Sequence, residues 1–292
     1  MDMKNKLTLF ALLMMMCSAS AFADNDVQKE KMVTAKFSFL TGSATVADHY
    51  LSDQEYNGTV MGLSMDFGSF YKKSENLSWD LDITYFLSPY SSSITDFSLA
   101  NPAKTAFYSL HSFRADYGTY YNWNPVKNLY IKAGGSFDLL AGMIMGKPNQ
   151  INNILDLDFQ TQFKAAAGVR YGWNFKKFDL FLQADVAVPF LGTALSSSPY
   201  SASLDNFLGS QILPGKTSVY HLTSFHNMKG FNLSYGVDFV FRKTTWFIST
   251  EINNRWWNLT GVQNYRLYNM RRIGVLVDLV AHPRRNSDNR YF

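Results

Sequence analysis

The segment from Leu157 to Val188 constrains the fold of this chain more than any other. Odd-numbered residues from Leu157 to Phe175 are apolar or aromatic except Thr161, and the even-numbered ones are mostly polar or small. After Lys176-Lys177, the alternation restarts and continues through 178–188. A period of two indicates a β-strand, and the first run far exceeds the usual ~5–6 residues. Two such strands joined by a tight turn are typical of a transmembrane β-barrel hairpin.

The same pattern recurs along the chain and predicts ten strands. They lie at about 33–41, 56–71, 77–88, up to 123, 129–145, 157–175, 178–188, 231–241, 245–257 and 265–280. Long loops are expected at 42–55, 89–105, 146–156 and 191–230, and short turns between them. Bacterial barrels have an even strand number, short periplasmic turns and long extracellular loops. We therefore predict an all-β, transmembrane, antiparallel up-and-down barrel of ten strands, or of twelve if 191–230 holds another hairpin.

Aromatic residues support a membrane-embedded barrel. Those expected to face outward close to a short turn are Tyr71, Trp79, Tyr121, Trp123, Tyr171, Trp173, Phe178, Phe241 and Trp246. Such a set would form one interfacial girdle. The alternative is a soluble β-sandwich, whose strands also alternate but whose apolar faces are buried between two sheets.

The first residues indicate export. Lys4 and Lys6 precede the apolar run 7–16, and Ala21-Phe22-Ala23 ends a small-residue segment, so residues 1–23 are interpreted as a secretory signal peptide. The single barrel domain is then 24–292, without cysteine, because the sole cysteine, Cys17, leaves with the signal; lipid attachment at Cys17 is the alternative.

The expected location is the outer membrane of a Gram-negative bacterium. The terminal Phe292 resembles the signal read by the barrel-assembly machinery, an expected partner during biogenesis, as outer-membrane lipid is afterwards. The formal charge of +4 is too small to indicate a nucleic-acid partner.

The predicted lumen carries charges of both signs. The network comprises Asp66, Asp80, Asp82, Arg114, Asp138, Lys164, Arg170, Asp185, Glu251 and Arg255. Turn geometry predicts that Arg114 opposes Asp138 and that Arg170 is diagonal to Asp185. A narrow barrel holds side chains and at most a small ligand, so these charges are expected to form a plug.

One predicted pairing joins two acids. Asp66 should oppose Asp82, with Asp80 nearby, and like charges in such positions are destabilising. Arg114 on the next strand is the base expected between them. A cation or proton site and a slip in the turn register are the alternative explanations.

Two Ser/His groups are candidates for catalysis. Ser109 and His111 share the lipid-facing side of one strand near its extracellular end, where a nucleophile and base would meet lipid. His221, Ser224 and His226 lie within the longest loop. No metal-ligand spacing, phosphate-binding loop or cofactor motif is present.

The first loop carries a motif. Its residues are Asp48, Tyr50, Leu51, Ser52, Glu55, Tyr56 and Gly58. This motif resembles the corresponding loop of an uncharacterised family of outer-membrane barrels from Bacteroidetes, defined as a domain of unknown function. The resemblance implies the barrel fold and no activity. The loop itself is interpreted as a capped turn, with Asp48 and Ser52 bonding local amides, or as a ligand-contacting lip.

These observations predict a non-enzymatic outer-membrane barrel without cofactor or metal. Its loops would bind an extracellular ligand or partner, or its lumen would pass a small solute. The alternative is an outer-membrane lipid hydrolase that uses Ser109 and His111.

Overall fold

The protein folds as a closed antiparallel β-barrel. A computed structural model describes residues 33–48, 55–70, 76–94, 104–146, 155–195, 220–241, 244–259 and 262–278. Its strands are β1 (Thr34–Asp48), β2 (Glu55–Phe70), β3 (Leu77–Ile94), β4 (Lys104–Val126), β5 (Leu129–Gly146), β6 (Leu155–Asn174), β7 (Asp179–Leu195), β8 (Tyr220–Ser224), β9 (Met228–Phe241), β10 (Thr244–Leu259) and β11 (Val262–Asp278).

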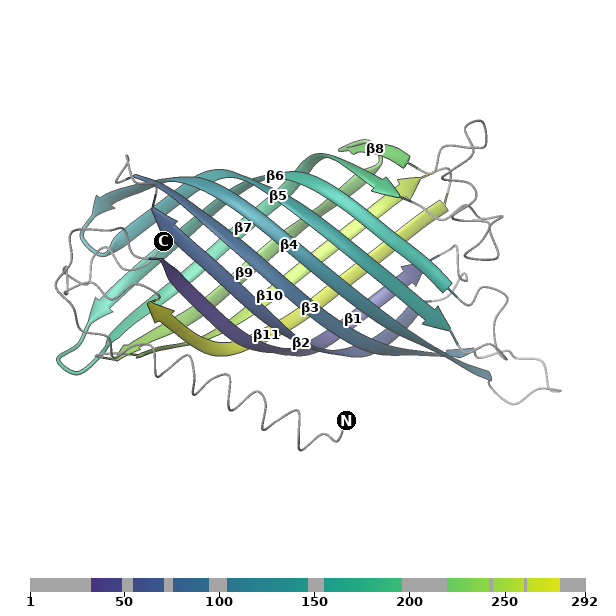
Figure 1. Ribbon diagram of the computed structural model, residues 1–292, viewed down its shortest axis with the longest axis horizontal. Coiled ribbons are helices and arrows are strands. Elements are labelled where there is room, and N and C mark those ends of the chain that lie inside the picture. Colours follow the sequence, from purple (N-terminus) through teal and green to yellow (C-terminus); the bar gives the residue numbers. More distant parts are fainter. Residues whose placement is uncertain are drawn as a thin grey trace.

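Ten strands close the barrel. The sheet order is β6-β5-β4-β3-β2-β1-β11-β10-β9-β7, and a β6–β7 pairing closes the circle (Figure 1). The predicted ten-stranded barrel is thus confirmed. The twelve-stranded alternative is wrong, because β7 pairs directly with β9 in the wall. Within 191–230, the described residues add one short strand outside this circle, β8, which pairs with residues 191–195 of β7.

Several strands extend into segments predicted as loops. β1 continues to Asp48, β3 to Ile94 and β7 to Leu195, so the predicted loops 42–55, 89–105 and 191–230 begin within strands. The reason is visible in β1, where Ala44 and Val46 point inward and are buried. Apolar residues inside the lumen reverse the expected pattern, so alternation alone ends the strand too early.

The two ends of the barrel differ in their connections. At the short-turn end, β4 and β5 are joined at Lys127-Asn128, where Asn128 has φ 66°, a conformation that asparagine tolerates. The β6–β7 turn is closed by the amide of Phe175, which donates to the carbonyl of Phe178 at 2.9 Å. The opposite, long-loop end carries the connections 49–54, 95–103, 147–154 and 196–219.

The barrel is apolar outside and polar inside, the reverse of a soluble domain. Outward side chains such as Phe163, Tyr117 and Ile273 are exposed, whereas Asp138, Lys164 and Arg114 are almost fully buried. A soluble sandwich is therefore excluded, because its apolar faces would be covered. In the described part of the chain, no helix is long and apolar enough to cross a membrane.

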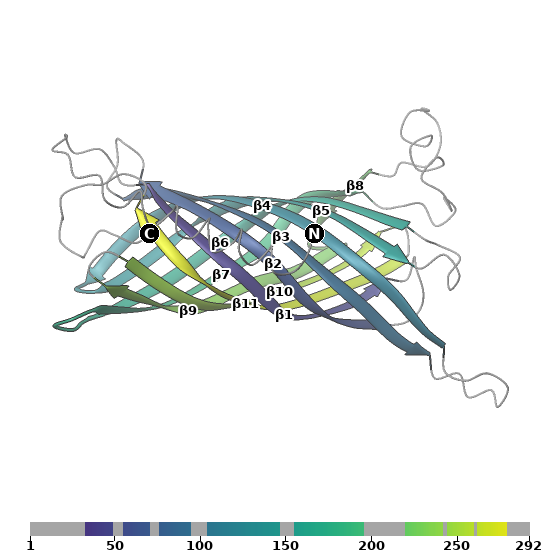
Figure 2. The same cartoon turned by 60° about the horizontal axis from the view of Figure 1, so that its bottom comes forward.

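Outward aromatic side chains gather at the short-turn end. Trp79, Tyr121, Trp123, Tyr171, Trp173, Phe178, Phe241 and Trp246 lie there, while the predicted Tyr71 falls outside the described residues. Phe178 contacts both Phe175 and Phe241, with ring centroids 4.8 and 6.0 Å apart. Phe178 and Phe241 are far apart in sequence but meet in this ring because β7 pairs with β9. The strands cross the long axis of the barrel obliquely (Figure 2).

Candidate functional site

Four aspartates form a row across adjacent strands of the lumen wall. Asp66 on β2 opposes Asp82 on β3, Asp82 opposes Asp116 on β4, and Asp116 opposes Asp138 on β5. The predicted Asp66–Asp82 pairing is confirmed. Because like charges directly opposite one another are destabilising, this row requires cations from elsewhere in the lumen.

Two arginines neutralise one half of the row. Arg272 Nη1 from β11 lies 3.3 Å from Asp66 and 2.7 Å from Asp82, and Arg114 Nη2 lies 3.3 Å from Asp82. Both guanidinium groups also pair with Glu251 of β10. Arg114 is thus a base for Asp82 as predicted, but Arg272 bridges the two acids.

Lys164 and Arg255 neutralise the other half. Lys164 of β6 pairs with Asp116, and its Nζ is 3.6 Å from Asp138. Arg255 Nη2 of β10 lies 2.5 Å from the same Asp138 oxygen. We call these residues the charged layer, which comprises Asp66, Asp82, Asp116, Asp138, Glu251, Arg114, Lys164, Arg255 and Arg272.

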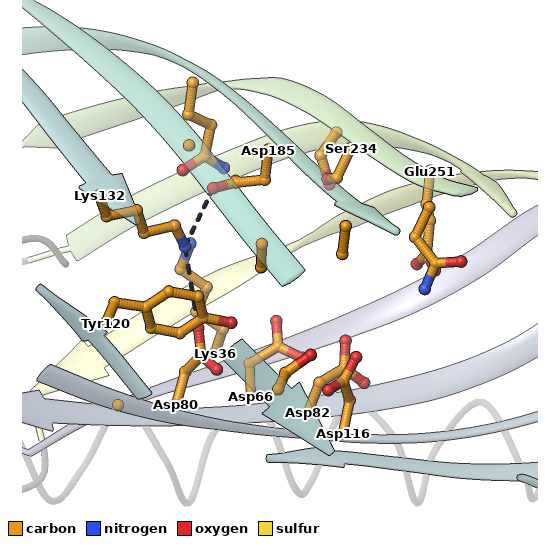
Figure 3. Close-up of a pocket in the computed structure, with 18 of the residues that line it drawn as sticks. Lys36, Asp66, Asp80, Asp82, Asp116, Tyr120, Lys132, Asp185, Ser234 and Glu251 are labelled. Carbon is orange, nitrogen blue, oxygen red and sulfur yellow. Dashed lines mark ion pairs between the residues drawn. The ribbon is translucent and has the colours of Figure 1, made fainter. Parts of the chain in front are cut away.

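A second group of charges lies closer to the short-turn end. Lys132 Nζ is 3.0 Å from Asp185 and 3.8 Å from Asp80, and it stands 4.6 Å from the Tyr120 ring centroid (Figure 3). Gly168 makes room for this arrangement, because a Cβ there would overlap the Asp185 carboxylate. Two partly exposed carboxylates therefore share one ammonium group.

A cavity of about 250 Å³ lies between these two groups. Its lining includes Asp80, Asp185, Lys132, Asp66 and Glu251 (Figure 3), together with Arg272. Lys36 and Phe247 also line the cavity, and the Lys36 ammonium lies 5.3 Å from the Phe247 ring centroid. The cavity thus offers a polar ligand charges of both signs.

Apolar packing fills the lumen toward the long-loop end. We call this group the apolar cluster, which comprises Leu40, Ala44, Val46, Tyr56, Val60, Phe86, Leu110, Ile144, Tyr268 and Met270. Leu40, Val60, Leu110 and Met270 have 0% exposure. Beside it, Arg266 Nη1 pairs with Asp158 at 2.5 Å. A smaller apolar group, Tyr130, Phe181, Val240 and Leu276, packs at the short-turn end.

One of the two predicted charge pairs needs correction. Arg114 opposes Leu140, not Asp138, because β4 continues to Val126 and Trp123 pairs with Ile131, two residues beyond the Leu129 that a turn at 124–128 implies. Arg170 opposes Gln183 and is diagonal to Asp185, as predicted. Its ionic partner in the structure is nevertheless Asp238, at 3.1 Å.

Sequence reasoning missed two arginines that pair inside the lumen, Arg266 and Arg272. The signal was available, because the alternation that points Ile273 outward also points Arg272 and Arg266 inward. Asp158, the partner of Arg266, could not be identified from sequence because it lies on β6, distant in the chain, whereas Glu251 lies on β10, the strand just before β11, diagonal to Arg272.

The motif of the first loop is divided between strands and undescribed residues. Asp48 ends β1, while Glu55, Tyr56 and Gly58 belong to β2. Tyr56 is buried in the apolar cluster. Tyr50, Leu51 and Ser52 lie outside the described residues, so the capped turn stays a prediction.

The two Ser/His groups differ in geometry. His111 Nδ1 is hydrogen-bonded to the Tyr85 hydroxyl at 2.9 Å on the outer wall, so this nitrogen is not directed at Ser109. Ser224 Oγ and His226 Nδ1 are 2.5 Å apart at the turn after β8. Asn227 fixes this turn by accepting from the Ser224 amide and donating to the Leu222 carbonyl. Among the described residues, no cluster of His, Cys, Asp or Glu could hold a metal ion.

Comparison with known families gives a match over nearly the whole chain. The family described as "Protein of unknown function (DUF3316)" matches residues 7–286. The chain belongs to the DUF3316 family. The resemblance to a barrel family of unknown function is confirmed at that level, and its Bacteroidetes origin stays a prediction. No curated protein matches this DUF3316 member.

Solved structures similar to this DUF3316 chain include several outer-membrane barrels. The outer membrane protease OmpT from Escherichia coli is 8% identical, with 88% of this chain and 99% of that chain covered and a TM-score of 0.44. The translocator domain of autotransporter NalP from Neisseria meningitidis is 12% identical, with coverages of 93% and 95% and a TM-score of 0.37. The COG4313 outer membrane channel from Pseudomonas putida F1 is 11% identical, with coverages of 87% and 98% and a TM-score of 0.31. At these TM-scores the likenesses carry no argument about activity.

Proposed function

We propose that the protein is an integral, non-enzymatic outer-membrane barrel whose lumen is closed and whose long-loop end binds a surface ligand or partner. The apolar outer wall and the aromatic ring at the short-turn end support membrane insertion. The observation that carries the closed lumen is the apolar cluster, in which Leu40, Val60, Leu110 and Met270 are completely buried.

The charged layer supports the same proposal. Arg114 and Arg272 cross the lumen to Glu251 and Asp82, and these four side chains occupy its middle. Open aqueous channels appear in barrels of ~16–18 strands, whereas barrels of about eight are filled by side chains. A ten-stranded barrel with these contacts is closer to the filled case.

Two measurements test this proposal. The protein is expected in the outer-membrane fraction, where its migration on a gel should change on heating. Recovery in the soluble fraction without such a change would refute membrane insertion. Planar bilayers containing the wild-type barrel are expected to be electrically silent, and a steady single-channel conductance would refute the closed lumen.

Binding of a small solute is the second candidate, and the cavity of about 250 Å³ favours it. Because acids and bases line the cavity together, a small zwitterion or organic cation fits its chemistry. Thermal-shift measurements with glycine betaine, putrescine and glucose would test this candidate. Stabilisation by a charged probe that disappears in Asp185→Asn is expected, and equal responses to all three probes would contradict it.

The lipid-hydrolase alternative is tested separately. Purified barrel is expected to release no fatty acid from phospholipid vesicles, with Ser109→Ala identical to wild type. Fatty-acid release that Ser109→Ala abolishes would show that the protein is an enzyme.

A further inference from the structure

The outer wall of the barrel is not uniformly apolar. On β5, outward residues stay apolar toward the long-loop end through Phe137, Leu139, Ala141, Met143 and Met145. On β11, the outward series Val277, Val275, Ile273 is followed by Arg271 and Asn269. On β1, Phe37 and Phe39 are followed by Thr41 and Ser43. The apolar part of the wall is therefore much shorter on the β1–β11 side.

These side chains form a compact group that we call the polar patch: Thr41, Ser43, Thr250, Asn269 and Arg271. Arg271 opposes Thr41 on one neighbouring strand and Thr250 on the other, and Asn269 opposes Ser43. All are exposed except Thr250, which is half-buried. No ion pair of the described residues involves Arg271, although exposed apolar residues such as Ile273 and Phe39 lie directly beside it.

The height of the patch makes it costly in lipid. A strand tilted by ~40° rises roughly 2.5 Å along the barrel axis per residue, so Arg271 lies roughly 15 Å above Val277. The apolar band of such barrels is ~25 Å tall, and an arginine on the lipid face at mid-height is strongly destabilising. Arg271 therefore needs a polar partner at this level.

A tilt of the barrel does not remove this cost. Tilting raises the apolar band on one side and lowers it on the other, but it does not shorten the band. A second copy of the chain is also unfavourable, because the patch contains no acid and two patches would bring two Arg271 side chains together. Charge complementarity calls for an anion.

Residues above the patch indicate where the anion comes from. Between Arg271 and the long-loop end, the outward positions of β11 are Leu267 and Tyr265, but those of β1 and β2 include Thr45, Thr59 and Asn57, so a polar path along β1 and β2 connects the patch to that end of the barrel. At the same end, Lys229 Nζ stands 5.6 Å from the Trp256 ring centroid. Lipid headgroups approach a barrel from its rim, whereas a protein acid would have to be buried in the bilayer.

We propose that the polar patch binds the phosphate of an anionic lipid in the leaflet at the long-loop end. Arg271 would supply two parallel guanidinium donors, and Thr41, Thr250 and Asn269 would add hydroxyl and amide donors, a set suited to phosphate. This inference rests on the membrane insertion proposed above. It predicts one anionic lipid held on the β10–β11–β1 side while the rest of the wall contacts acyl chains.

The test uses the full-length barrel in neutral detergent with two lipids that differ only by a phosphate group. Phosphatidic acid is expected to raise the thermal midpoint of wild type, and diacylglycerol with the same acyl chains is not. In Arg271→Gln, the apparent affinity for phosphatidic acid should fall about tenfold or more, since a charged hydrogen-bonded group contributes ~1.5–3 kcal/mol. Lys177→Gln, at the short-turn end, is the matched control and should respond like wild type.

Other outcomes would overturn the proposal. Equal responses of wild type and Arg271→Gln to phosphatidic acid would overturn it. Stabilisation of wild type by inorganic phosphate to the same extent as by phosphatidic acid would also overturn it. So would cross-linking of residue 271 to another copy of the chain. Without lipid, Arg271→Gln should be at least as stable as wild type, and a lower midpoint would assign Arg271 a structural role instead. Thr41→Val keeps the charge and should weaken the response partly. Loss of heat-modifiable migration in wild type would refute membrane insertion itself.

Discussion

The charged layer and the apolar cluster fill the same lumen by opposite means. In the charged layer, four aspartates in one row are neutralised by bases from β4, β6, β10 and β11. In the apolar cluster, completely buried side chains such as Leu40 and Met270 exclude water by contact. Buried ion pairs often add little stability over apolar packing, but a slip of one residue would point every charge at lipid. We infer that the charged layer fixes strand register and the apolar cluster seals the lumen.

The largest expected effect breaks the charged layer. Arg272→Met removes the cation that contacts Asp66, Asp82 and Glu251. Removing one partner of a buried charge group typically costs about 3–5 kcal/mol, so the free energy of unfolding should fall by this amount in urea titrations in lipid vesicles. A loss below about 1 kcal/mol would mean that water solvates these carboxylates well enough to replace the arginine.

A second substitution distinguishes charge from packing. Asp66 has Arg272 as its cation partner in the described layer, so Asp66→Asn combined with Arg272→Met removes one charge of each sign. The double variant should regain part of the lost unfolding free energy. If the losses of the single variants Asp66→Asn and Arg272→Met simply add in the double variant, the proposal that charge fixes the strand register is contradicted.

The next effect concerns the apolar cluster. Leu110→Ala leaves a cavity at a position with 0% exposure, and such changes cost about 2–5 kcal/mol. The same urea titration measures it, and Leu110→Met, which nearly conserves volume, should cost less than about 1.5 kcal/mol. Neutralising a lumen acid should not restore the unfolding free energy lost in Leu110→Ala, in contrast to the loss in Arg272→Met. Recovery in such a double variant would contradict separate roles for the charged layer and the apolar cluster.

The two parts also differ in how far the sequence predicts them. Alternation placed Asp66, Asp82, Arg114 and Glu251 inside the lumen, because period two follows directly from strand geometry. It also paired Asp66 with Asp82, since a short turn fixes the register of its hairpin. The predicted β4–β5 register was wrong because β4 continues through Pro125 to Val126, so the turn is two residues long instead of the expected 124–128.

The apolar cluster was missed for a different reason. Leu40, Val60 and Leu110 are apolar residues at inward positions, so the rule of apolar outside and polar inside does not identify them. Contacts across the lumen, such as Arg114 of β4 with Glu251 of β10, depend on barrel diameter and strand stagger. A linear sequence does not show these quantities directly.

A smaller effect is expected where the charged side chains border the cavity. Lys132→Met removes the ammonium shared by Asp80 and Asp185, whose side chains are 38% and 35% exposed. Because water already screens these carboxylates, the unfolding free energy should fall by only about 1–2 kcal/mol. The additional change Asp185→Asn should recover most of it. A loss as large as that of Arg272→Met would place this group in the charged layer.

The smallest effect lies on the outer wall and tests whether the hydrogen bond of His111 matters at all. Tyr85→Phe keeps the ring but removes the hydroxyl that lies 2.9 Å from His111 Nδ1. Both residues are on the outer wall, where Tyr85 is 45% exposed, so the bond is outside the packed lumen. The unfolding free energy should change by about 0.5–1 kcal/mol, the net value of a single hydrogen bond. A loss above about 3 kcal/mol would mean that this outer-wall pair, and not the lumen alone, fixes the position of β3 against β4.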